Sequence, residues 1–292
     1  MVKSLETNQY DIITFGDMCV DLIMTGDDVT PCFGQVEKLV ENYFLEMGGS
    51  CCIFACQAAR LGLRVGILGL VGDDDFGRLI LRRLNEWGVD TRHVIVDPIL
   101  KTGIGVALCQ GNDRAILTYL GSLNAITPQD VRDDFLASAR HLHHGSFFLH
   151  THLLPHIPAI FQRAHDLGLT ISLDTNWDPD EQWDSTLAQA LPFTDVFLPN
   201  EQEALRISHT SSLDQAVSYF HSRGIPILPV KRGVDGARLY IEYQDPIEHV
   251  LPPASGGDSV GAGDSFDAGF LAGWLRGYSL EKCLEIACHC GR

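Results

Sequence analysis

Residues 48–72 read GGSCCIFACQAARLGLRVGILGLVG and contain the pattern that decides the fold. Two glycines precede an apolar helical segment that ends at Gly62, and a buried strand follows over residues 64–71. Upstream, YDIITFGDMCVDLIM at residues 10–24 contains a β-branched apolar run that ends at Gly16, which predicts another buried strand. A strand, a helix and a second strand in this order form a βαβ unit, so the sequence predicts a parallel sheet.

The alternation of strands and helices continues to the end of the chain. We expect helices near 76–87, 156–167, 264–276 and 279–290, and strands near 141–148, 169–174 and 195–199 and within IPILPVKRG and ARLYIEY. Two segments, 22–46 and 98–121, alternate more weakly and predict antiparallel strands that stand off the main sheet as a small β lid. Because the sequence has no repeat or linker, we expect one α/β domain over residues 1–292 with these lid segments inserted.

Composition narrows the class of protein. The 292 residues carry a formal net charge of −17, with the acids scattered along the chain. Such a surface disfavours nucleic acid and anionic membranes as partners, because binding phosphate needs a basic surface. No apolar stretch reaches the roughly 18 residues of a membrane-spanning helix, and the first residues lack a signal-peptide core. Nine cysteines, an odd number, predict free thiols in a reducing compartment, so we expect a cytoplasmic protein.

A glycine turn near the end of the chain predicts an anion site. In GGDSVGAGDSFDAGFLAGWL, residues 256–275, Gly261 and Gly263 allow positive φ and close approach of a ligand at the N-terminus of a helix. The turn lacks the lysine of a Walker A loop and the G-x-G-x-x-G spacing of dinucleotide sites. Asp264 would repel a bound phosphate unless it received a proton, as the base does in phosphoryl transfer to a hydroxyl. The alternative is a helix N-cap formed by Asp264, with Asp267 three residues on.

The stretch DSVGAGDSF resembles the D-[ST]-x-G-A-G-D signature of the PfkB (ribokinase-like) carbohydrate kinase family. The resemblance implies a ribokinase-like three-layer α/β fold, with a mostly parallel central sheet flanked by helices. It also implies an ATP-dependent phosphotransferase that acts on a hydroxyl of a small sugar or sugar-like substrate. Asp264 would be the catalytic base, and the amides would stabilise the phosphoryl group in flight. The matching residues are Asp258, Ser259, Gly261, Ala262, Gly263 and Asp264.

Two further stretches match the substrate side of the family. GDMCVD resembles the first-strand motif and places Asp21 where the family binds a substrate hydroxyl, for which an ionised carboxylate is a suitable acceptor. MGGSCCIFACQAARLG resembles the second signature, in which Gly48 and Gly49 let the backbone approach the substrate. Family members usually have Asn where this chain has Ile53. Since Ile neither donates nor accepts a hydrogen bond, ordinary ribose or fructose recognition is in doubt.

The nucleotide side of the family is matched in part. LPNEQEA carries Asn200 and Glu203, which match the family's N-x-x-E and would organise Mg²⁺ largely through water. The alternative for this pair is an Asn N-cap with an acid in the first helical turn. PVKRGVDG resembles the nucleotide-binding turn, with Gly233 retained and Lys231 in place of the usual Thr. The resemblance places Asn200, Gly233 and Lys231 at the nucleotide. The specific role of Lys231 stays open, because a lysine at a strand end is usually solvated.

Other family features concern cations and the strand ends. In the family, Asp258 lies near a K⁺ site, so K⁺ is a further expected cofactor beside ATP and Mg²⁺. SLDTNWDP resembles the family's D-x-N strand end at Asp174 and Asn176. Six histidines lie between residues 141 and 156. No H-E-x-x-H motif or nearby cysteine pair accompanies them, so we expect neutral imidazoles in preference to a metal site. The final ACHCGR stops in an apparent helix that relatives usually follow with another element, which suggests a truncated chain.

Several functions stay open at this point. A nucleoside kinase of the same family is the first alternative, because a base could occupy the space beside Ile53. A non-catalytic ligand-binding homologue is the second, although it would not need Asp264. A nicotinamide dehydrogenase is the third, and the missing glycine fingerprint disfavours it. The lid strands of such kinases often pair between subunits, so the resemblance also implies a homodimer through the lid.

Overall fold

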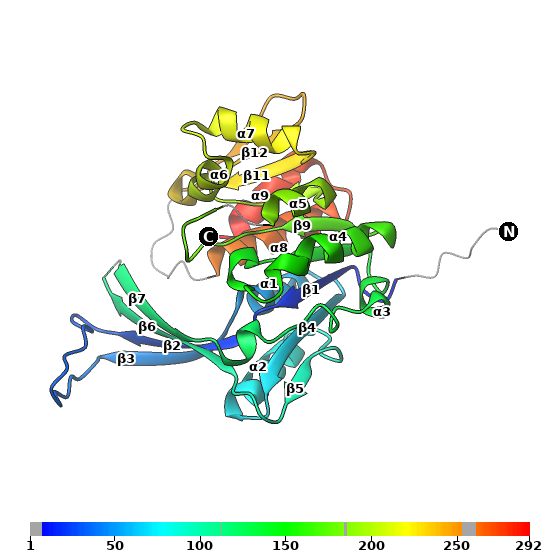
Figure 1. Ribbon diagram of the computed structural model, residues 1–292. Helices are drawn as coiled ribbons and strands as arrows, with labels where there is room; N and C mark the ends of the chain where they lie inside the picture. The colour runs from blue at the N-terminus through cyan, green and yellow to red at the C-terminus, as the bar shows by residue number, and fades with distance from the viewer. Residues whose placement is uncertain (1–7, 112, 184–185, 253–260) are drawn as a thin grey trace.

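The computed structural model describes residues 8–111, 113–183, 186–252 and 261–292. In these ranges, nine strands form one sheet in the order β13-β12-β11-β10-β9-β8-β1-β4-β5 (Figure 1). The strands from β11 to β5 are parallel, whereas β12 and β13 pair antiparallel at the edge. Their bounds are β1 Ile12–Gly16, β4 Val65–Gly72, β5 Ile95–Asp97, β8 His141–His144, β9 Thr170–Leu173, β10 Val196–Phe197, β11 Ile227–Lys231, β12 Ala237–Ile241 and β13 Ile247–His249.

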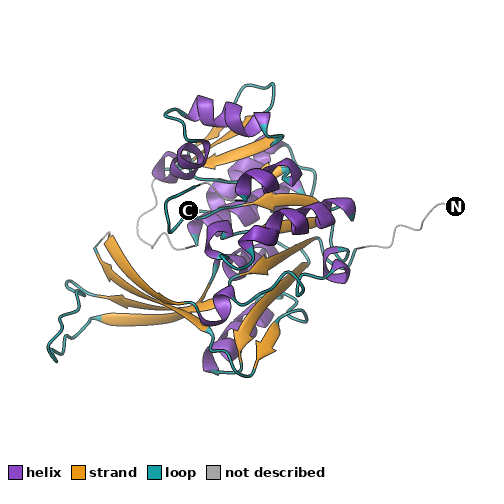
Figure 2. Ribbon diagram, in the orientation of Figure 1, coloured by secondary structure: helices purple, strands orange, loops and turns teal. Residues whose placement is uncertain are grey.

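Helices cover both faces of this sheet (Figure 2). One apolar cluster joins the sheet to α3, α4, α5, α6 and α7, and the other joins it to α1, α2, α8 and α9. This is a three-layer arrangement, and the predicted mostly parallel α/β fold is confirmed. The helices are α1 Ser50–Arg60, α2 Asp75–Glu86, α3 Asp133–Leu136, α4 Ile157–Asp166, α5 Leu187–Ala190, α6 Glu201–Ser208, α7 Leu213–Ser222, α8 Ala262–Trp274 and α9 Leu280–Cys290.

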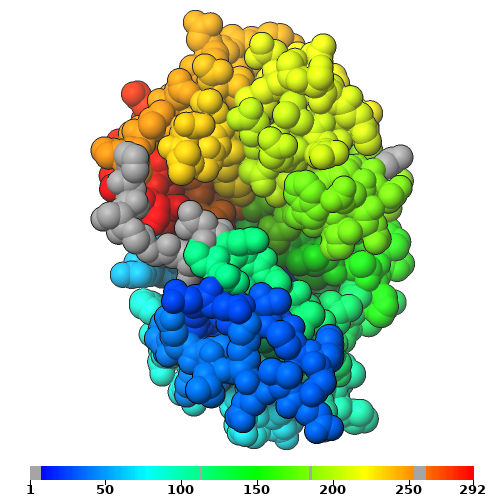
Figure 3. All heavy atoms as spheres, turned by 90° about the vertical axis from the view of Figure 1, so that its left-hand side faces the viewer, coloured from blue at the N-terminus to red at the C-terminus, as the bar shows by residue number. Residues whose placement is uncertain are grey.

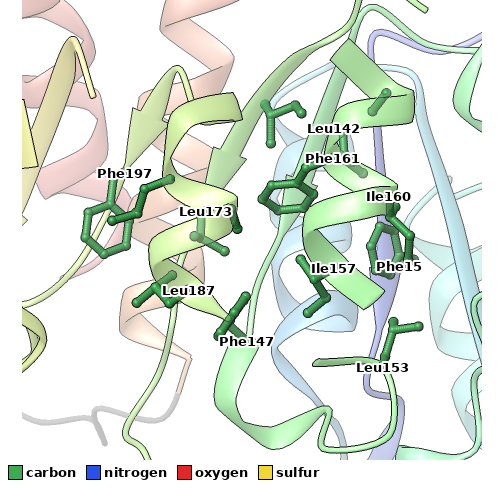
Figure 4. Close-up of a cluster of buried hydrophobic side chains, with 14 of the residues drawn as sticks. Phe15, Leu142, Phe147, Leu153, Ile157, Ile160, Phe161, Leu173, Leu187 and Phe197 are labelled. Atoms are coloured by element: carbon green, nitrogen blue, oxygen red, sulfur yellow. The ribbon is translucent and has the colours of Figure 1, made fainter. Parts of the chain in front are cut away.

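The strand pattern explains the layers, because successive side chains of a strand point to opposite faces. In β1, Ile12 belongs to the cluster under α1 and α8, whereas Ile13 and Phe15 belong to the cluster under α4. Figure 4 shows Phe161 and Ile157 of α4 directed into the cluster that contains Phe15. A strand buried on both faces needs a continuous apolar run, which is the pattern seen in the sequence.

A second sheet of four strands projects from the body in the order β3-β2-β6-β7 (Figure 1). Its strands are β2 Cys19–Thr25, β3 Asn42–Gly48, β6 Gly103–Gln110 and β7 Asp113–Tyr119. β3 and β7 pair antiparallel with β2 and β6, while β2 and β6 are parallel to each other. Figure 3 shows this sheet, blue and blue-green, standing forward on one face of the molecule. β2 begins and β3 ends a few residues outside the first expected lid segment, 22–46. β6 and β7 lie within the second expected segment, 98–121.

Some elements are shorter than expected. β8 spans only His141–His144, because the chain then turns through Ser146 at φ 55° instead of continuing to residue 148. β10 is reduced to Val196–Phe197. None of the helices within the described ranges has the length and apolar character needed to cross a membrane. All nine cysteines are free, as predicted.

Four histidines of the histidine-rich segment are buried. Burial lowers the pKa of His141 and His144 well below the ordinary value, lowers that of His150, and lowers that of His143 to about 3. Their imidazoles are therefore neutral at physiological pH, in agreement with the prediction. Across the described part of the chain, no three His, Cys, Asp or Glu side chains are arranged to hold a metal ion.

The close packing of α8 on α9 depends on a glycine. A Cβ atom on Gly269 would lie 2.9 Å from the Cα of Ala287 and 3.0 Å from the Sγ of Cys290, closer than such atoms normally pack. Only a residue without a Cβ lets the two helices approach in this way. α8 thereby packs closely on α9 at the middle of its length.

We therefore expect Gly269→Ala to destabilise the protein, although alanine favours helix by about 1 kcal/mol. Overpacking costs roughly 1–3 kcal/mol, so a net loss of about 1 kcal/mol is expected in urea unfolding. The control is Gly26→Ala, where the atoms nearest to an added Cβ lie at 3.5 Å. An increase in stability for Gly269→Ala would contradict this account of the packing.

Candidate functional site

The functional side chains gather where the parallel strands end. Asp17 follows β1, Asp174 follows β9, Asn200 follows β10, and Lys231 is the last residue of β11. Asn200 and Lys231 also form an isolated parallel bridge. Because these strands are parallel, their carboxyl ends meet at one edge of the sheet, which is where α/β proteins bind ligands. The N-terminus of α8 faces the same edge.

The glycine turn begins α8 in the expected way. Gly261 is the N-cap residue at φ 73°, a left-handed conformation that favours glycine. The N–H of Ser265 donates the first hydrogen bond of the helix, to the carbonyl of Gly261 at 2.9 Å. The amides of Ala262, Gly263 and Asp264 precede that bond, so they have no acceptor within the helix. They form a set of donors at the positive end of the helix dipole.

Asp264 is the third residue of α8 and is 8% exposed. Since Gly261 occupies the N-cap position, the alternative that Asp264 is a helix N-cap is wrong. Burial raises the pKa of Asp264 to about 8, helped by the charges of Asp174 and Asp17 and opposed by Lys231 and a hydrogen bond with Ser50. A carboxyl group with this pKa can exchange a proton near neutral pH, which suits a general base.

Lys231 is not the solvated strand-end lysine that the sequence suggested. Its side chain is 13% exposed, and its Nζ lies 2.7 Å from Oδ2 of Asp174 and 3.2 Å from Oδ1 of Asp267. Burial alone would lower the pKa of Lys231, but the two carboxyl groups raise it above its ordinary value. The side chain therefore stays charged inside the protein. Lys231 therefore lies beside acids that are far from it along the chain, and its charge offsets theirs.

The two acids beside Lys231 titrate in opposite directions. Burial acts to raise the pKa of Asp174, but the charge of Lys231 and several hydrogen bonds lower it below the ordinary value. Burial raises the pKa of Asp267 well above the ordinary value, and Lys231 offsets only part of that. Asp174 is accordingly the ionised partner of Lys231. Asp267 does not cap α8; it lies in the second turn of the helix, fully buried.

Asp17 organises the other helix that starts at this edge. α1 has Gly49 at its N-cap position and no side-chain cap of its own. The carboxylate of Asp17 accepts instead, from the N–H of Ser50 at 2.8 Å and from that of Cys51 at 3.3 Å. Asn176, at φ 55°, donates from Nδ2 to the hydroxyl oxygens of Ser50 and Ser146 at 3.1 and 2.8 Å. These contacts fix the chain ends of β1, β8 and β9 against α1.

The expected substrate residues lie together at the base of the second sheet. A Cβ on Gly48 would overlap the Asp21 carboxylate, and one on Gly105 would lie 2.7 Å from Oδ1 of Asp21. A Cβ on Gly49 would lie 2.6 Å from the carbonyl oxygen of Asp17. Burial raises the pKa of Asp21, and the charge of Asp17 adds to this. Gly48 and Gly49 are thus required by the packing of the two acids, whatever they also offer a ligand.

Asn200 and Glu203 form the capping box that was the alternative for this pair. The Asn200 carboxamide oxygen accepts from the N–H of Glu203 at 2.9 Å, and Oε2 of Glu203 accepts from the N–H of Asn200 at 2.8 Å. Glu203 is nonetheless 5% exposed, and burial with the charge of Asp174 raises its pKa to about 7, with Lys231 acting in the opposite direction. The pair therefore has a structural role, and its metal role stays a prediction.

The structure shows few contacts for Gly233 and does not describe Asp258, the expected nucleotide and cation residues. Gly233 begins a 3₁₀ turn at φ 58°, with no atom within 4 Å of an added Cβ, so its face is open. Asp258 and Ser259 lie outside the described residues.

Ile53 packs against the glycine turn. A Cβ on Gly261 would lie 2.9 Å from Cγ2 of Ile53. Ile53 also lines a cavity of about 420 Å³ together with Met47, Cys56, Gln57 and Trp87, among others. Ile53 therefore forms an apolar wall between the glycine turn and this cavity. The resemblance to the family led us to expect a polar Asn at this position.

Sequence reasoning missed Asp17, Ser50 and Ser146. Asp17 could have been found, because it directly follows a buried strand whose carboxyl end belongs to the ligand-binding edge of a parallel sheet. Ser50 and Ser146 follow glycines at similar places, but small hydroxyl residues there are too common to single out.

The residues present fit the groups that the fold family implies. ATP would need backbone amides that can donate to its phosphate oxygens, and the first amides of α8 have no acceptor within the helix. Mg²⁺ prefers oxygen ligands, and Glu203 keeps one carboxylate oxygen outside its capping bond. Within the described ranges, Lys231 is the lysine that sits among these acids.

Comparison with known proteins agrees with this geometry. The sequence model for pfkB family carbohydrate kinase matches residues 9–292. The chain belongs to the pfkB carbohydrate kinase family. As a member it is an enzyme that phosphorylates a sugar hydroxyl with ATP, so the non-catalytic and dehydrogenase alternatives are set aside.

Relatives in the pfkB family support the assignment. The chain is 32% identical to an ATP-dependent ribose-1-phosphate kinase of Halopiger xanaduensis, over 84% of this chain and 78% of the relative. It is 27% identical to a 5-dehydro-2-deoxygluconokinase of Geobacillus thermodenitrificans, over 96% and 86%. A crystal structure described as Ribokinase II from E. coli, in complex with ATP and Mg²⁺, superposes with a TM-score of 0.84 at 27% identity, covering 96% of this chain and 91% of that one. The predicted ribokinase-like fold is confirmed.

The raised pKa of Asp264 has a consequence for stability. Its folded-state pKa of about 8 exceeds the ordinary value of 3.8, so the folded protein binds this proton more tightly than the unfolded chain does. The contribution of Asp264 to stability is therefore fully present below pH 4 and is lost as the pH rises through about 8. The uncharged carboxamide side chain of an asparagine in the same place would avoid this loss of stability.

We expect Asp264→Asn and wild type to have similar melting temperatures at pH 4, and the variant to melt higher at pH 8.5. Circular dichroism melting curves across this range measure the difference. A gap that stays constant with pH would show that Asp264 is not a buried group with a raised pKa.

Proposed function

We propose that this enzyme transfers the terminal phosphoryl group of ATP to a hydroxyl of a small sugar, with Asp264 as the general base. The observation that carries the proposal is the buried Asp264 carboxyl, with a pKa of about 8, beside helix amides that lack intrahelical acceptors. Together they supply a proton acceptor and an anion hole within one turn of helix, the two elements that phosphoryl transfer to an alcohol needs.

The residues of this chain have distinct proposed tasks. Asp264 accepts the proton of the attacking hydroxyl. The amides of Gly261, Ala262 and Gly263 donate to the phosphoryl oxygens as negative charge develops there. Asn200 and Glu203 would hold Mg²⁺ largely through water, and Gly233 would leave room for the nucleotide. Bound Mg·ATP supplies the phosphoryl group and the positive charge that offsets its oxygens.

On the substrate side, Asp21 would accept hydrogen bonds from sugar hydroxyls, and Gly48 and Gly49 would bring backbone close to the sugar. The second sheet, which carries Asp21, would act as a lid over the site and exclude water as a competing acceptor. We propose that residues 1–292 work as one kinase domain with this inserted lid. Free thiols throughout favour the cytoplasm as the place of action.

A nucleoside is the second candidate substrate. Ile53 presents an apolar wall beside the glycine turn, and the cavity of about 420 Å³ next to it includes Trp87. An apolar wall and an aromatic ring suit a nucleobase or an apolar sugar substituent better than a bare sugar hydroxyl. Competition between free sugars and nucleosides would separate the two classes.

The test of the proposed function is ADP release from Mg·ATP with a panel of pentoses, hexoses, sugar acids, sugar phosphates and nucleosides. We expect turnover on one panel member, and a loss of at least about 100-fold in kcat for Asp264→Asn, the usual scale for a general base. Thermal melting at pH 4 serves as the control for folding. Turnover that persists in Asp264→Asn would exclude Asp264 as the base.

K⁺ activation is proposed through Asp258, by analogy with the family. Identical rates in K⁺ and in a large organic cation would remove this proposal.

We propose that the enzyme forms a homodimer through the outer face of the second sheet. The strand pairing puts Tyr43, Leu45, Leu117 and Tyr119 on the same face, and they are 67%, 37%, 67% and 53% exposed. Such an apolar surface on one sheet is typical of a protein contact.

Light scattering should give twice the 32.2 kDa chain mass for wild type and one chain mass for Leu117→Asp. The matched control is Tyr243→Asp, at an apolar residue that is 94% exposed in a turn outside that sheet. A wild type that is monomeric at high concentration would contradict the dimer.

A further inference from the structure

Lys231 has a position that its expected contact with nucleotide does not explain. Its ammonium lies 2.7 Å from Asp174, which follows β9, and 3.2 and 3.5 Å from the two carboxyl oxygens of Asp267 in α8. Both partners are almost fully buried, with 3% and 0% exposure. An ammonium has three donors, and these contacts direct it into the protein.

The same ammonium also reaches the first turn of α8. A Cβ on Gly263 would lie 3.5 Å from Nζ of Lys231. Gly263 and Asp267 are four residues apart, so they lie one above the other on the same face of the helix. Lys231 therefore lies against this face of α8, bonded to Asp267 in the second turn and close to Gly263 in the first. Removing it would leave a gap between β9, β11 and α8.

We propose that Lys231 is a positioning residue, whose buried ammonium fixes the first turn of α8 against the end of β9 and so sets the place and the charge of the Asp264 carboxyl. The inference rests on the proposed function, in which Asp264 is the base. It assigns Lys231 no contact with the nucleotide.

The charges around Lys231 indicate what its removal would do. Titratable groups face this region from every packed element: Asp17 beyond β1, His143 on β8, Asp174 beyond β9, Glu203 on α6, and Asp264 and Asp267 on α8. Lys231 lowers the pKa of both Asp264 and Glu203 against the effect of burial. Without it, Asp174 loses its cationic partner and keeps only hydrogen bonds such as that from the N–H of Asn176. Asp264 would then hold its proton to higher pH.

A lysine suits this place better than an arginine would. Its ammonium is a compact point charge on a flexible stem, whereas a guanidinium is planar and larger. Two buried carboxyl groups hold the ammonium from separate elements, with Gly263 beside it, an arrangement that suits the smaller group. Arginine would keep the charge and disturb the packing.

The experiment is the pH dependence of kcat/KM with the substrate that wild type turns over. For Lys231→Met we expect the acid limb of the profile to move up by about one pH unit, the lower end of the effect of a nearby charge. Activity should then be about tenfold lower at pH 7 and recover at high pH, with the KM for ATP changed less than twofold. Lys231→Arg should keep the acid limb in place, even where kcat falls. The matched control is Lys282→Met, at an exposed lysine paired with Glu285 on α9.

A second variant keeps the test decisive if Lys231→Met does not fold. In Lys231→Met with Asp174→Asn, the ammonium and its ionised partner are removed together, so no unpaired charge stays buried. Asp174 raises the pKa of Asp264 and Lys231 lowers it, so the acid limb should return toward that of wild type.

An unmoved acid limb in Lys231→Met would overturn the inference, as would a large rise in the KM for ATP, which would make Lys231 a nucleotide ligand. These outcomes differ from failure of the proposed function. In that case wild type itself would show no turnover on the panel, or Asp264→Asn would stay active.

Discussion

The structure depends on burying several carboxyl groups beside one ammonium at the edge of a parallel sheet. Asp174, Asp264, Asp267 and Glu203 are each less than a tenth exposed, and Lys231 is the cation that the described residues place among them. An isolated buried charge is costly, so such groups must be paired or take up protons. Both happen here: Asp174 pairs with Lys231, while Asp264, Asp267 and Glu203 have raised pKa values.

This constraint connects the fold with the chemistry. A parallel sheet collects its strand ends at one edge, and helices that return to that edge present their N-termini there. α1 uses its N-terminal amides to bind the carboxylate of Asp17, so they are occupied within the protein. α8 likewise begins at a glycine without a side-chain cap, but its first amides have no carboxylate acceptor among the described residues. Of the two helix starts, α8 is therefore the one with amides to offer to a phosphoryl group, and the acid held beside it has a pKa suited to proton transfer.

Local signals in the sequence predicted most of the fold. The apolar runs around Ile12 and Ile67, the glycines that end helices and the weak alternation of two segments are short-range features, and they predicted the parallel sheet and the second sheet. Element ends such as that of β8 were less accurate, because Ser146 turns the chain in a conformation that tertiary contacts, including the hydrogen bond from Asn176, impose.

The candidate site was predicted only where its residues are close in sequence. The turn from Gly261 to Asp264 was found because its geometry is local. The role of Lys231 was not, because its partners Asp174 and Asp267 are 57 and 36 residues away. A strand-end lysine gives no sign in the sequence that the fold will surround it with acids. For the same reason, the capping box of Asn200 and Glu203 was recognisable, whereas the burial that raises the pKa of Glu203 to about 7 was not.

The most direct measurement is a ¹³C NMR titration of aspartate carboxyl carbons, in which the signal missing from Asp264→Asn identifies Asp264. We expect this carboxyl to titrate near pH 8, about four units above an ordinary aspartate. Titration near pH 4 would contradict it, because Asp264 would then be an ordinary ionised carboxylate and not a buried base beside a single ammonium.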